Sequence, residues 1–144
     1  MTNIVDPHLS PDYMPSIDEE YMSAKMLAYF RQRLLDWRDE LLSETEHTVE
    51  GMREEGGIQE PDLTDRASAE IDHGLELRTR DRYRKLINKI EQALARIETG
   101  EYGYCEETGD PIGVKRLLAR PNATLSIEAQ ERHERDEKVK RDDD

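Results

Sequence analysis

Two carboxylates, Asp62 and Asp65, are the side chains whose type and spacing best suit chemistry in this sequence. They lie three residues apart and follow the glycine pair Gly56 and Gly57, which predicts a reversal of the chain. At a helix start, such carboxylates accept hydrogen bonds from free amides and interact favourably with the helix dipole, each effect being worth about 1 kcal/mol. At an exposed tip they can also bind a partner's cations or act near a Mg²⁺ centre.

Other reactive residue types are sparse. The single cysteine, Cys105, excludes an internal disulfide and cannot by itself form a tetrahedral thiolate site for zinc. Its acidic neighbours Glu106 and Glu107 are expected to raise the pKa of the thiol, so a packed thiol is predicted rather than a redox sensor. The histidines lack the spacing of metal ligands: His8, His47, His73 and His133. Without a nucleophile–base pair or a glycine-rich phosphate loop, the sequence predicts a protein that is not an enzyme.

The composition favours long exposed helices over a thick-cored globule. Charged residues make up 38% of the chain and hydrophobic residues 35%, a mixture typical of helices with a narrow apolar seam. The net charge of -13 disfavours direct contact with nucleic acid unless the basic side chains gather on one face. No apolar run approaches the roughly 20 residues needed to cross a bilayer, so a cytoplasmic protein is expected.

The first part of the chain predicts an arm followed by a long helix. Three prolines in residues 1–15 predict an extended or flexible arm, and Ser16 with Glu19 has the spacing of a capping box that would start a helix. A helix over residues 17–54 would be roughly 55 Å long, so much of it must face solvent. Its apolar residues recur at steps of four and three, as in a coiled coil: Met26, Phe30, Leu34, Trp37 and Leu41.

A second long helix is predicted to return along the first. Asp62 or Thr64 would cap its start, and Gly100 would stop it just after Ile97. Its apolar pattern is comparable to that of the first helix: Leu75, Tyr83, Leu86, Ile90 and Leu94. Because the link between the helices is short, they must pack antiparallel. The predicted fold is mainly α, a long antiparallel coiled-coil hairpin over residues 16–100 with an acidic tip at 56–67.

Two smaller elements are expected after the hairpin. Residues 101–129 are rich in turn-forming residues and predict a small base lobe. A few apolar side chains are available to pack it: Ile112, Val114, Leu117, Leu118 and Leu125. Ser126 opens a last helix, and residues 130–144 are assigned to that C-terminal helix and a charged tail that loses helical structure from about Lys138. A closed seam leaves little apolar surface for self-association, which favours a monomer.

Three blocks of sequence resemble the DksA/TraR family of polymerase-binding transcription factors: residues 61–67 (PDLTDRA), residues 75–87 (LELRTRDRYRKLI), and the segment from Gly103-Tyr104-Cys105 through residues 112–117 (IGVKRL) to 119–121 (ARP). They follow the order of the family and lie within residues 47–129. The resemblance implies a hairpin that enters the secondary channel of bacterial RNA polymerase with its acidic tip. It also implies a zinc-finger-like lobe at the base of the hairpin.

This sequence departs from the family's usual pattern at the zinc site. Members usually carry four zinc-binding cysteines in two C-x-x-C pairs, and here those positions hold Cys105, Thr108, Ser126 and Ala129. One thiol, two hydroxyls and a methyl group do not make the soft ligand set of a structural zinc site. Since cysteine-poor members occur in this family, the departure argues against metal rather than against membership. The lobe is therefore predicted to be a degenerate zinc-finger-like module without zinc.

The resemblance also assigns roles to residues of the hairpin. Asp62, Asp65 and Ala67 match the D-x-x-D-x-A tip that acts near the polymerase catalytic centre or trigger loop. For the two aspartates helix capping is the alternative role, and for Ala67 it is ordinary helix formation. Arg82 matches a contact with the rim of the channel. Without the resemblance, the sequence would predict that Arg82 lies on a solvated face of the helix.

Three positions match part of the family's site for the alarmone ppGpp: Leu86, Lys89 and Arg120. Cationic groups around a gap suit the phosphates of such a ligand. Gln130 stands where a basic residue is usual, so one charge of the site is missing. The alarmone is expected as an effector at the polymerase interface, and no cofactor is expected.

The resemblance implies a regulator of the stringent response that binds polymerase without contacting DNA. It would destabilise open complexes at stable RNA promoters and activate some biosynthetic promoters with ppGpp. Two alternatives stay open. A Gre-like transcript cleavage factor would hold a second Mg²⁺ at its tip, although such a tip carries an adjacent acidic pair rather than a D-x-x-D spacing. A coiled-coil adaptor or chaperone would use the seam or the base lobe instead.

Overall fold

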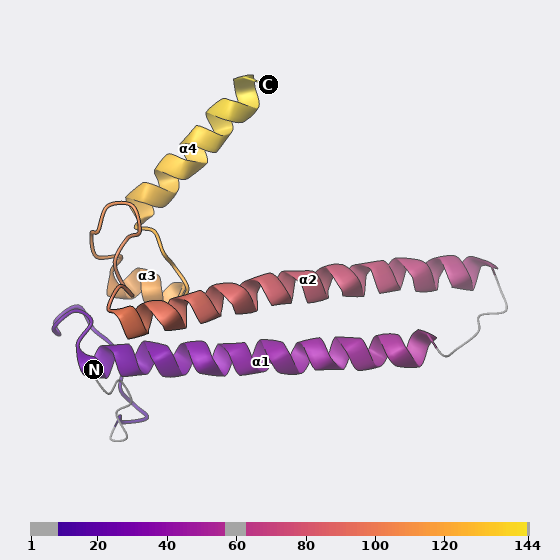
Figure 1. Cartoon of the computed structure of the whole chain (residues 1–144), viewed down its shortest axis with the longest axis horizontal. Coiled ribbons are helices and arrows are strands. Elements are labelled where there is room, and N and C mark those ends of the chain that lie inside the picture. The colour runs from indigo at the N-terminus through magenta and orange to yellow at the C-terminus, as the bar shows by residue number, and fades with distance from the viewer. Residues whose placement is uncertain (1–8, 57–62, 144) are drawn as a thin grey trace. The chain divides into compact units, whose positions relative to one another are not determined.

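The computed structural model describes residues 9–56 and 63–143 and is mainly helical, as predicted (Figure 1). The described residues form four helices, in chain order: α1 (Ala24–Gly56), α2 (Leu63–Thr99), α3 (Val114–Ala119) and α4 (Ile127–Asp143). Among these residues β pairing is limited to one isolated bridge, between Tyr104 and Pro111. In the same part of the chain, no helix is both long and apolar enough to pass through a membrane.

The chain divides into two units, and α1 and α2 contribute to both. The first unit combines Met1–Leu34 with Glu91–Asp144, and the second unit is Leu35–Ile90. Within each unit the segments of α1 and α2 run antiparallel, side by side (Figure 1). The predicted helical hairpin is thus confirmed, while its reversal at residues 57–62 lies outside the described residues.

The second unit is held by a narrow seam. Leu41 and Ile90 are buried in it, and Tyr83 is partly buried with its hydroxyl donating a hydrogen bond to the Glu44 carboxylate of α1. Leu75, which was predicted to lie in the seam, is 51% exposed. The reason is geometric, because eight residues separate it from Tyr83 and leave it about 80° away on the helix.

The helix α1 begins at Ala24, so the prediction of a start at residue 17 is wrong. One contact of the predicted capping box forms, because the Ser16 amide donates to the Glu19 carboxylate at 2.8 Å. The Ser16 hydroxyl donates to the same carboxylate at 3.3 Å, and the Glu19 amide donates to the Ser16 carbonyl at 3.5 Å instead of to the hydroxyl. They close a turn instead of a helix, and Met22 then takes a left-handed conformation with φ 55°. A local carboxylate–amide contact stabilises a turn as well as a helix start.

Ser23 is the residue that caps α1. Its hydroxyl oxygen accepts a hydrogen bond from the Met26 amide at 3.2 Å, and its carbonyl accepts one from the Leu27 amide at 2.9 Å. From this cap the predicted apolar repeat packs as expected, with Met26, Phe30 and Leu34 fully buried. The side chains that repeat at steps of four therefore form the buried face of α1 in the first unit.

Residues 9–23 fold back on the start of α1. The Tyr13 amide donates to the Ser10 carbonyl at 3.0 Å, and the Tyr13 ring meets the Tyr29 ring edge-on with centroids 5.9 Å apart. The Lys25 ammonium lies 4.4 Å from the centre of the Tyr13 ring. The described part of the predicted arm is therefore a packed turn, and residues 1–8 lie outside the described residues.

Gly100 ends the second helix, as predicted. It has φ 81°, a backbone conformation that glycine adopts without steric cost. Its amide donates to the Ile97 carbonyl at 3.3 Å, and the next amide, of Glu101, donates to the Arg96 carbonyl at 2.9 Å. This pair of hydrogen bonds is the Schellman arrangement. The Arg96 guanidinium adds a hydrogen bond to the Tyr104 carbonyl at 2.8 Å, so the chain leaves α2 in a fixed direction.

Within the first unit, the base lobe packs on the start of α1 and the residues before it through aromatic side chains. Tyr102 is 2% exposed, donates its hydroxyl to the Pro121 carbonyl at 2.7 Å, and lies 5.7 Å from the Phe30 ring. Tyr21 donates its hydroxyl to the Gly103 carbonyl at 2.6 Å and accepts from the Gly113 amide at 2.9 Å. Two residues that the sequence analysis did not single out thus fix the lobe to the hairpin.

Helix α4 continues to Asp143, so the predicted loss of helix from about Lys138 is wrong. Its side chains are exposed from Glu131 to Arg141. Acidic residues precede basic residues by four at five places, a spacing that adds roughly 0.2–0.5 kcal/mol per pair to an exposed helix: Glu128 and Arg132, Glu131 and Arg135, Glu134 and Lys138, Asp136 and Lys140, Glu137 and Arg141. This charge pattern accounts for a helix that lacks an apolar face.

Candidate functional site

The acidic block predicted at the tip coincides with the start of α2. Asp62 lies outside the described residues. Asp65 is the third residue of α2, where the helix dipole favours negative charge. Ala67 follows in the second turn, and its side chain is exposed. The structure therefore brings Asp65 and Ala67 together at one end of the helix.

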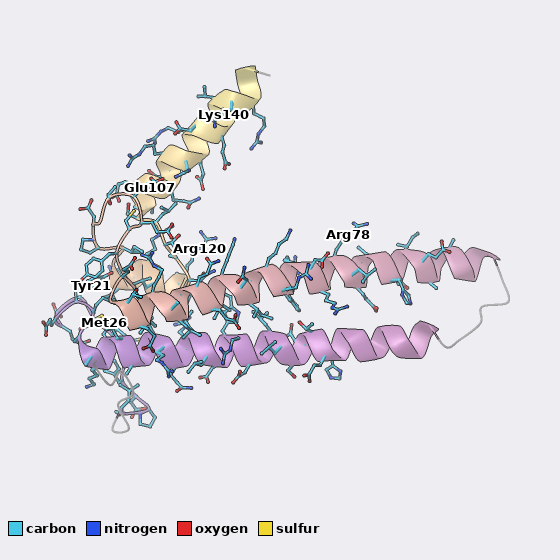
Figure 2. The ribbon with its side chains drawn as sticks, viewed as in Figure 1. Tyr21, Met26, Arg78, Glu107, Arg120 and Lys140 are labelled. Carbon is cyan, nitrogen blue, oxygen red and sulfur yellow. The ribbon has the colours of Figure 1, made fainter. Side chains whose placement is uncertain are left out.

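The basic residues of α2 are mostly solvent-exposed. Arg82 is exposed, with its guanidinium carbon 5.8 Å from the centre of the neighbouring Tyr83 ring. Arg84 pairs with Asp81 at 3.4 Å, so its charge is partly neutralised on the helix itself. Arg78 is also exposed, and Figure 2 shows it on the part of α2 that belongs to the second unit.

The positions matched to the alarmone site fall in both units. In the second unit, Leu86 is partly buried and Lys89 is exposed, one helical turn apart on α2. In the first unit, Arg120 is exposed and its backbone amide closes the end of α3 by donating to the Arg116 carbonyl at 2.7 Å. Gln130 is partly buried and donates its side-chain amide to Glu134 at 3.3 Å. The structure groups Leu86 with Lys89, and it describes Arg120 within a separate unit.

The four positions of the degenerate zinc pattern converge in the base lobe. Cys105, Ser126 and Ala129 are buried, with exposed fractions of 3%, 5% and 0%. The sulfur of Cys105 receives hydrogen bonds from the hydroxyl of Thr108 and from the backbone amide of Ser126. Residues 105–108, here called the knuckle loop, thus keep the layout of a zinc-binding loop, with backbone amides directed at the sulfur of Cys105.

The thiol of Cys105 is acidic. Burial raises its pKa, but hydrogen bonds from the Thr108 hydroxyl and from the backbone amides of Ser126, Thr108 and Glu107 outweigh burial and lower the pKa to about 6. The prediction that the glutamates raise this pKa is therefore wrong. Their side chains are exposed, and Glu107 contributes a backbone donor to the sulfur. The C-x-x-T spacing of residues 105–108 was the sequence signal for the donors from Glu107 and Thr108, but not for the amide of Ser126.

The donor set does not fit structural zinc. Thr108 and Ser126 already use their hydroxyl oxygens to accept the amides of Asp110 and Ala129, both at 3.2 Å. Ala129 has no ligand atom, which leaves a single thiolate where tetrahedral zinc needs four ligands. Across residues 9–56 and 63–143, no group of three or more His, Cys, Asp or Glu side chains is arranged to hold a metal ion.

A histidine of α4 contacts the knuckle loop. The His133 ring hydrogen-bonds the carboxylate of Glu107, which the label in Figure 2 locates on that loop. The hydrogen bond and the negative charge of Glu107 raise the pKa of His133, with smaller contributions from Asp136 and Glu137. The sequence analysis considered His133 only as a metal ligand and missed this contact, because the partner is 26 residues away.

Two family matches cover most of the chain. Residues 26–97 match the family described as "DnaK suppressor protein DksA, N-terminal domain", and residues 100–135 match the "Prokaryotic dksA/traR C4-type zinc finger". The two segments correspond to the helical hairpin and to the base lobe with the start of α4. The second match spans the knuckle even though three of its four cysteines are absent.

Relatives of known name are similar over nearly the whole chain. The RNA polymerase-binding transcription factor DksA of Caulobacter vibrioides is 61% identical over 132 residues, which is 92% of each chain. The protein of the same name from Escherichia coli is 47% identical over 116 residues, covering 81% of this chain and 76% of its own. The structure of transcription factor DksA2 from Pseudomonas aeruginosa matches with a TM-score of 0.78 and 41% identity, covering 84% of this chain and 94% of that chain. With the hairpin, the base lobe and both family segments in agreement, this chain belongs to the DksA/TraR family.

Proposed function

We propose that this chain is a transcription regulator that binds bacterial RNA polymerase and is not an enzyme. The observation that carries the proposal is a helical hairpin whose second helix begins at the D-x-x-D-x-A block, with Asp65 and Ala67 in its first turns. Two relatives named RNA polymerase-binding transcription factor DksA, at 61% and 47% identity, support it.

In this proposal the hairpin enters the secondary channel and its tip acts beside the catalytic centre or trigger loop. Asp62 and Asp65 supply carboxylates that engage cationic groups or perturb the Mg²⁺ site. The small exposed side chain of Ala67 permits close approach, and Arg82 contacts the rim of the channel. Binding shifts the polymerase away from the open complex, which lowers transcription from stable RNA promoters.

The alarmone ppGpp deepens this effect during the stringent response and supports activation of some biosynthetic promoters. Leu86, Lys89 and Arg120 form this chain's part of the alarmone site, with cations that suit phosphate groups. Gln130 supplies no charge, so the alarmone is held by fewer cations than in members with a basic residue there. Because coupling between two ligands is reciprocal, ppGpp strengthens the binding of this protein to polymerase as well.

The protein works without zinc or another cofactor, as a monomer in the cytoplasm. Its base lobe is stabilised by buried apolar side chains and by the hydrogen bonds around Cys105. A net charge of -13 disfavours direct binding to DNA, so promoter effects are transmitted through the polymerase.

The test is transcription in vitro from a ribosomal RNA promoter by purified bacterial polymerase in zinc-free buffer. Wild-type protein should inhibit, ppGpp should deepen the inhibition, and Asp65→Asn should lose inhibition while still binding polymerase. Asp72→Asn, which removes an exposed carboxylate further along α2, is the matched control and should inhibit like the wild type.

Other results would contradict the proposal. Inhibition retained by Asp65→Asn would remove the tip from the mechanism. Cleavage of backtracked RNA by the wild type would favour a Gre-like cleavage factor. An activity that needs neither polymerase nor the tip would favour a coiled-coil adaptor or chaperone.

A further inference from the structure

Residues 9–23, here called the N-terminal turn, hold two large apolar side chains in solvent. Met14 is 60% exposed and Ile17 is 72% exposed, three residues further along the chain. Among the described residues of the first unit, the other large apolar side chains with comparable exposure are Ile127 and Val139, about three turns apart on α4. Single exposed apolar residues are ordinary on a protein surface, whereas apolar residues that gather on one connecting segment are typical of an interaction surface.

The hydrogen bonds of the N-terminal turn order this surface in the free protein. The Tyr13 hydroxyl donates to the Glu19 carboxylate at 2.7 Å, and the Ser16 amide donates to the same carboxylate at 2.8 Å. Pro15, which stands between the two apolar residues, is buried. A partner that binds an ordered segment does not have to supply the free energy that would otherwise be needed to fix its conformation.

Carboxylates accompany the apolar pair. Three of them are exposed in the turn: Asp12, Asp18 and Glu20. Glu19 is also ionised at neutral pH, because hydrogen bonds from the Tyr13 hydroxyl and from the Ser16 amide lower its pKa. The first lysine or arginine of the sequence is Lys25, and its ammonium lies 4.4 Å from the centre of the Tyr13 ring. The turn therefore complements a surface that is both apolar and cationic.

The N-terminal turn lies outside both segments that match the family. Those segments cover residues 26–97 and 100–135, and the relatives at 61% and 47% identity are named for binding RNA polymerase. Residues that serve this shared partner are expected within the shared segments. An apolar and acidic surface that precedes them therefore suits a different partner.

We propose that the N-terminal turn is a docking surface for a second protein partner that presents a cationic amphipathic segment. Apolar side chains of that segment cover Met14 and Ile17, and its lysine or arginine side chains face the carboxylates of the turn. The contact does not use the hairpin and does not rest on the proposed function. If both hold, the chain connects RNA polymerase to the second protein.

Other occupants fit less well. A second copy that docked turn against turn would bring carboxylates together, which is unfavourable. Nucleic acid is repelled by the same carboxylates, as is a membrane surface rich in anionic lipids.

The start of α4 supplies matched controls in the same unit. Ile127 and Glu128 are exposed and repeat the order of Ile17 and Asp18, an apolar residue followed by an acidic one. The variants are Ile17→Ser against Ile127→Ser and Asp18→Asn against Glu128→Gln. All four positions are exposed, so thermal unfolding should be nearly unchanged in each variant.

The probe is a fluorescent amphipathic peptide of about five helical turns, with leucine on one face and lysine on the other. A peptide with glutamate in place of lysine is its negative control. Fluorescence anisotropy measures the binding of each peptide to the full chain at physiological ionic strength, where salt screens attraction between distant charges.

Ile17→Ser should weaken binding of the lysine peptide by about tenfold, the loss expected for an apolar anchor truncated at an interface. Adding Met14→Gln should weaken it further. Asp18→Asn should weaken binding by about threefold, and more at low salt. Ile127→Ser and Glu128→Gln should stay within about twofold of the wild type, and the glutamate peptide should not bind.

Oxidation of Met14 by hydroxyl radicals provides a second readout. In the free protein Met14 should be oxidised readily, because its side chain is exposed. The lysine peptide should slow this oxidation several-fold in the wild type and have little effect in Ile17→Ser. Tryptic digestion and mass spectrometry measure the oxidised fraction, and unchanged oxidation of Met14 with the peptide bound would refute the proposed contact.

The remaining outcomes separate this inference from the proposed function. Lack of binding to the lysine peptide, or equal losses in Ile17→Ser and Ile127→Ser, would overturn the docking surface. Weaker binding of Ile17→Ser to purified polymerase would assign the turn to polymerase, and self-association that Ile17→Ser abolishes would assign it to a second copy. Either result would refute the inference. Failure of the wild type to bind polymerase would overturn the proposed function and leave the docking surface standing.

Discussion

Cys105 combines two opposing influences, burial in the base lobe and hydrogen bonds donated to its sulfur. The donors prevail and the pKa of the thiol is lowered to about 6. Above about pH 6 the loop therefore holds a negatively charged sulfur surrounded by N–H and O–H groups. In this chain a thiolate takes the central place in the knuckle, which gives the lobe a pH-dependent source of stability.

The first prediction concerns that pH dependence. Because the folded pKa is below the ordinary value, the thiolate stabilises the fold fully above about pH 8.5, and this contribution is lost as the pH falls through about 6. The free energy of unfolding of the wild type, relative to Cys105→Ala, should thus be greater at pH 9 than at pH 6, by roughly 2 to 4 kcal/mol. Urea unfolding at a series of pH values measures it, and a constant difference would contradict the prediction.

The second prediction concerns Tyr21, whose hydroxyl links the Gly103 carbonyl to the Gly113 amide. Tyr21→Phe leaves both groups without this partner and should lower the free energy of unfolding by about 1–3 kcal/mol. Tyr29→Phe is the matched control, because the Tyr29 hydroxyl donates to the Met14 sulfur at 3.6 Å in an exposed contact. If both variants lost a similar amount of unfolding free energy, the two hydrogen bonds of the Tyr21 hydroxyl would not be the cause of the loss.

At this scale the sequence was informative about residue types but not about partners far along the chain. The position of Asp65 near the start of α2 could be predicted from a local motif, and the sequence itself shows that three of the four usual cysteines are absent. The pKa of Cys105 could not be predicted in this way, because Ser126, one of its donors, lies 21 residues away in the sequence. Tyr21 escaped notice for the same reason, since its two partners become neighbours only after the base lobe folds.

At the scale of elements, some local signals predicted helix boundaries correctly and others did not. Gly100 marked the end of α2 because few other residues accept a left-handed conformation at such a site. The pair Ser16 and Glu19 marked a turn instead of a helix, since the same hydrogen bonds serve both. Leu75 was misassigned to the seam because its apolar character was considered without its angular position around the helix.

The third prediction uses two glycines with opposite roles in α2. Gly100 has φ 81° and Gly74 lies inside the helix, and an added Cβ meets no atom within 4 Å at either position. Gly100→Ala should therefore destabilise the protein by about 1 kcal/mol through backbone strain alone. Gly74→Ala should stabilise it by about 0.5–1 kcal/mol, because alanine favours helix and lowers the entropy of the unfolded chain. Chemical denaturation measures the free energy of unfolding of both variants. If the two substitutions changed it in the same direction, this account would be contradicted.

At the scale of the whole molecule, sequence blocks identified the family and periodicity identified the hairpin. Apolar steps of four and three require a partner helix, and Gly56 with Gly57 requires a reversal, so the antiparallel arrangement followed. The two units could not be anticipated, because α1 and α2 cross from one to the other without a break in helical sequence.

The fourth prediction is that the molecule folds without zinc. Purified protein should contain far less than one zinc per chain, and a chelator should leave its Tm unchanged. The triple variant T108C/S126C/A129C should bind one zinc and gain a Tm that a chelator lowers, because it restores four thiolates to a loop that keeps the knuckle layout. Stoichiometric zinc in the wild type would refute the prediction.

Helix α4 is stabilised by pairs of opposite charges and by its capped start, not by burial of its outer turns. Its amides beyond Glu134 should therefore exchange with deuterium through local fraying, at rates that low denaturant barely alters. The amides of buried Phe30 and Ile97 should exchange only when the first unit opens. The outer turns of α4 and the buried turns of the first unit should therefore differ widely in exchange rate, and added salt that screens the charge pairs should accelerate exchange only in α4.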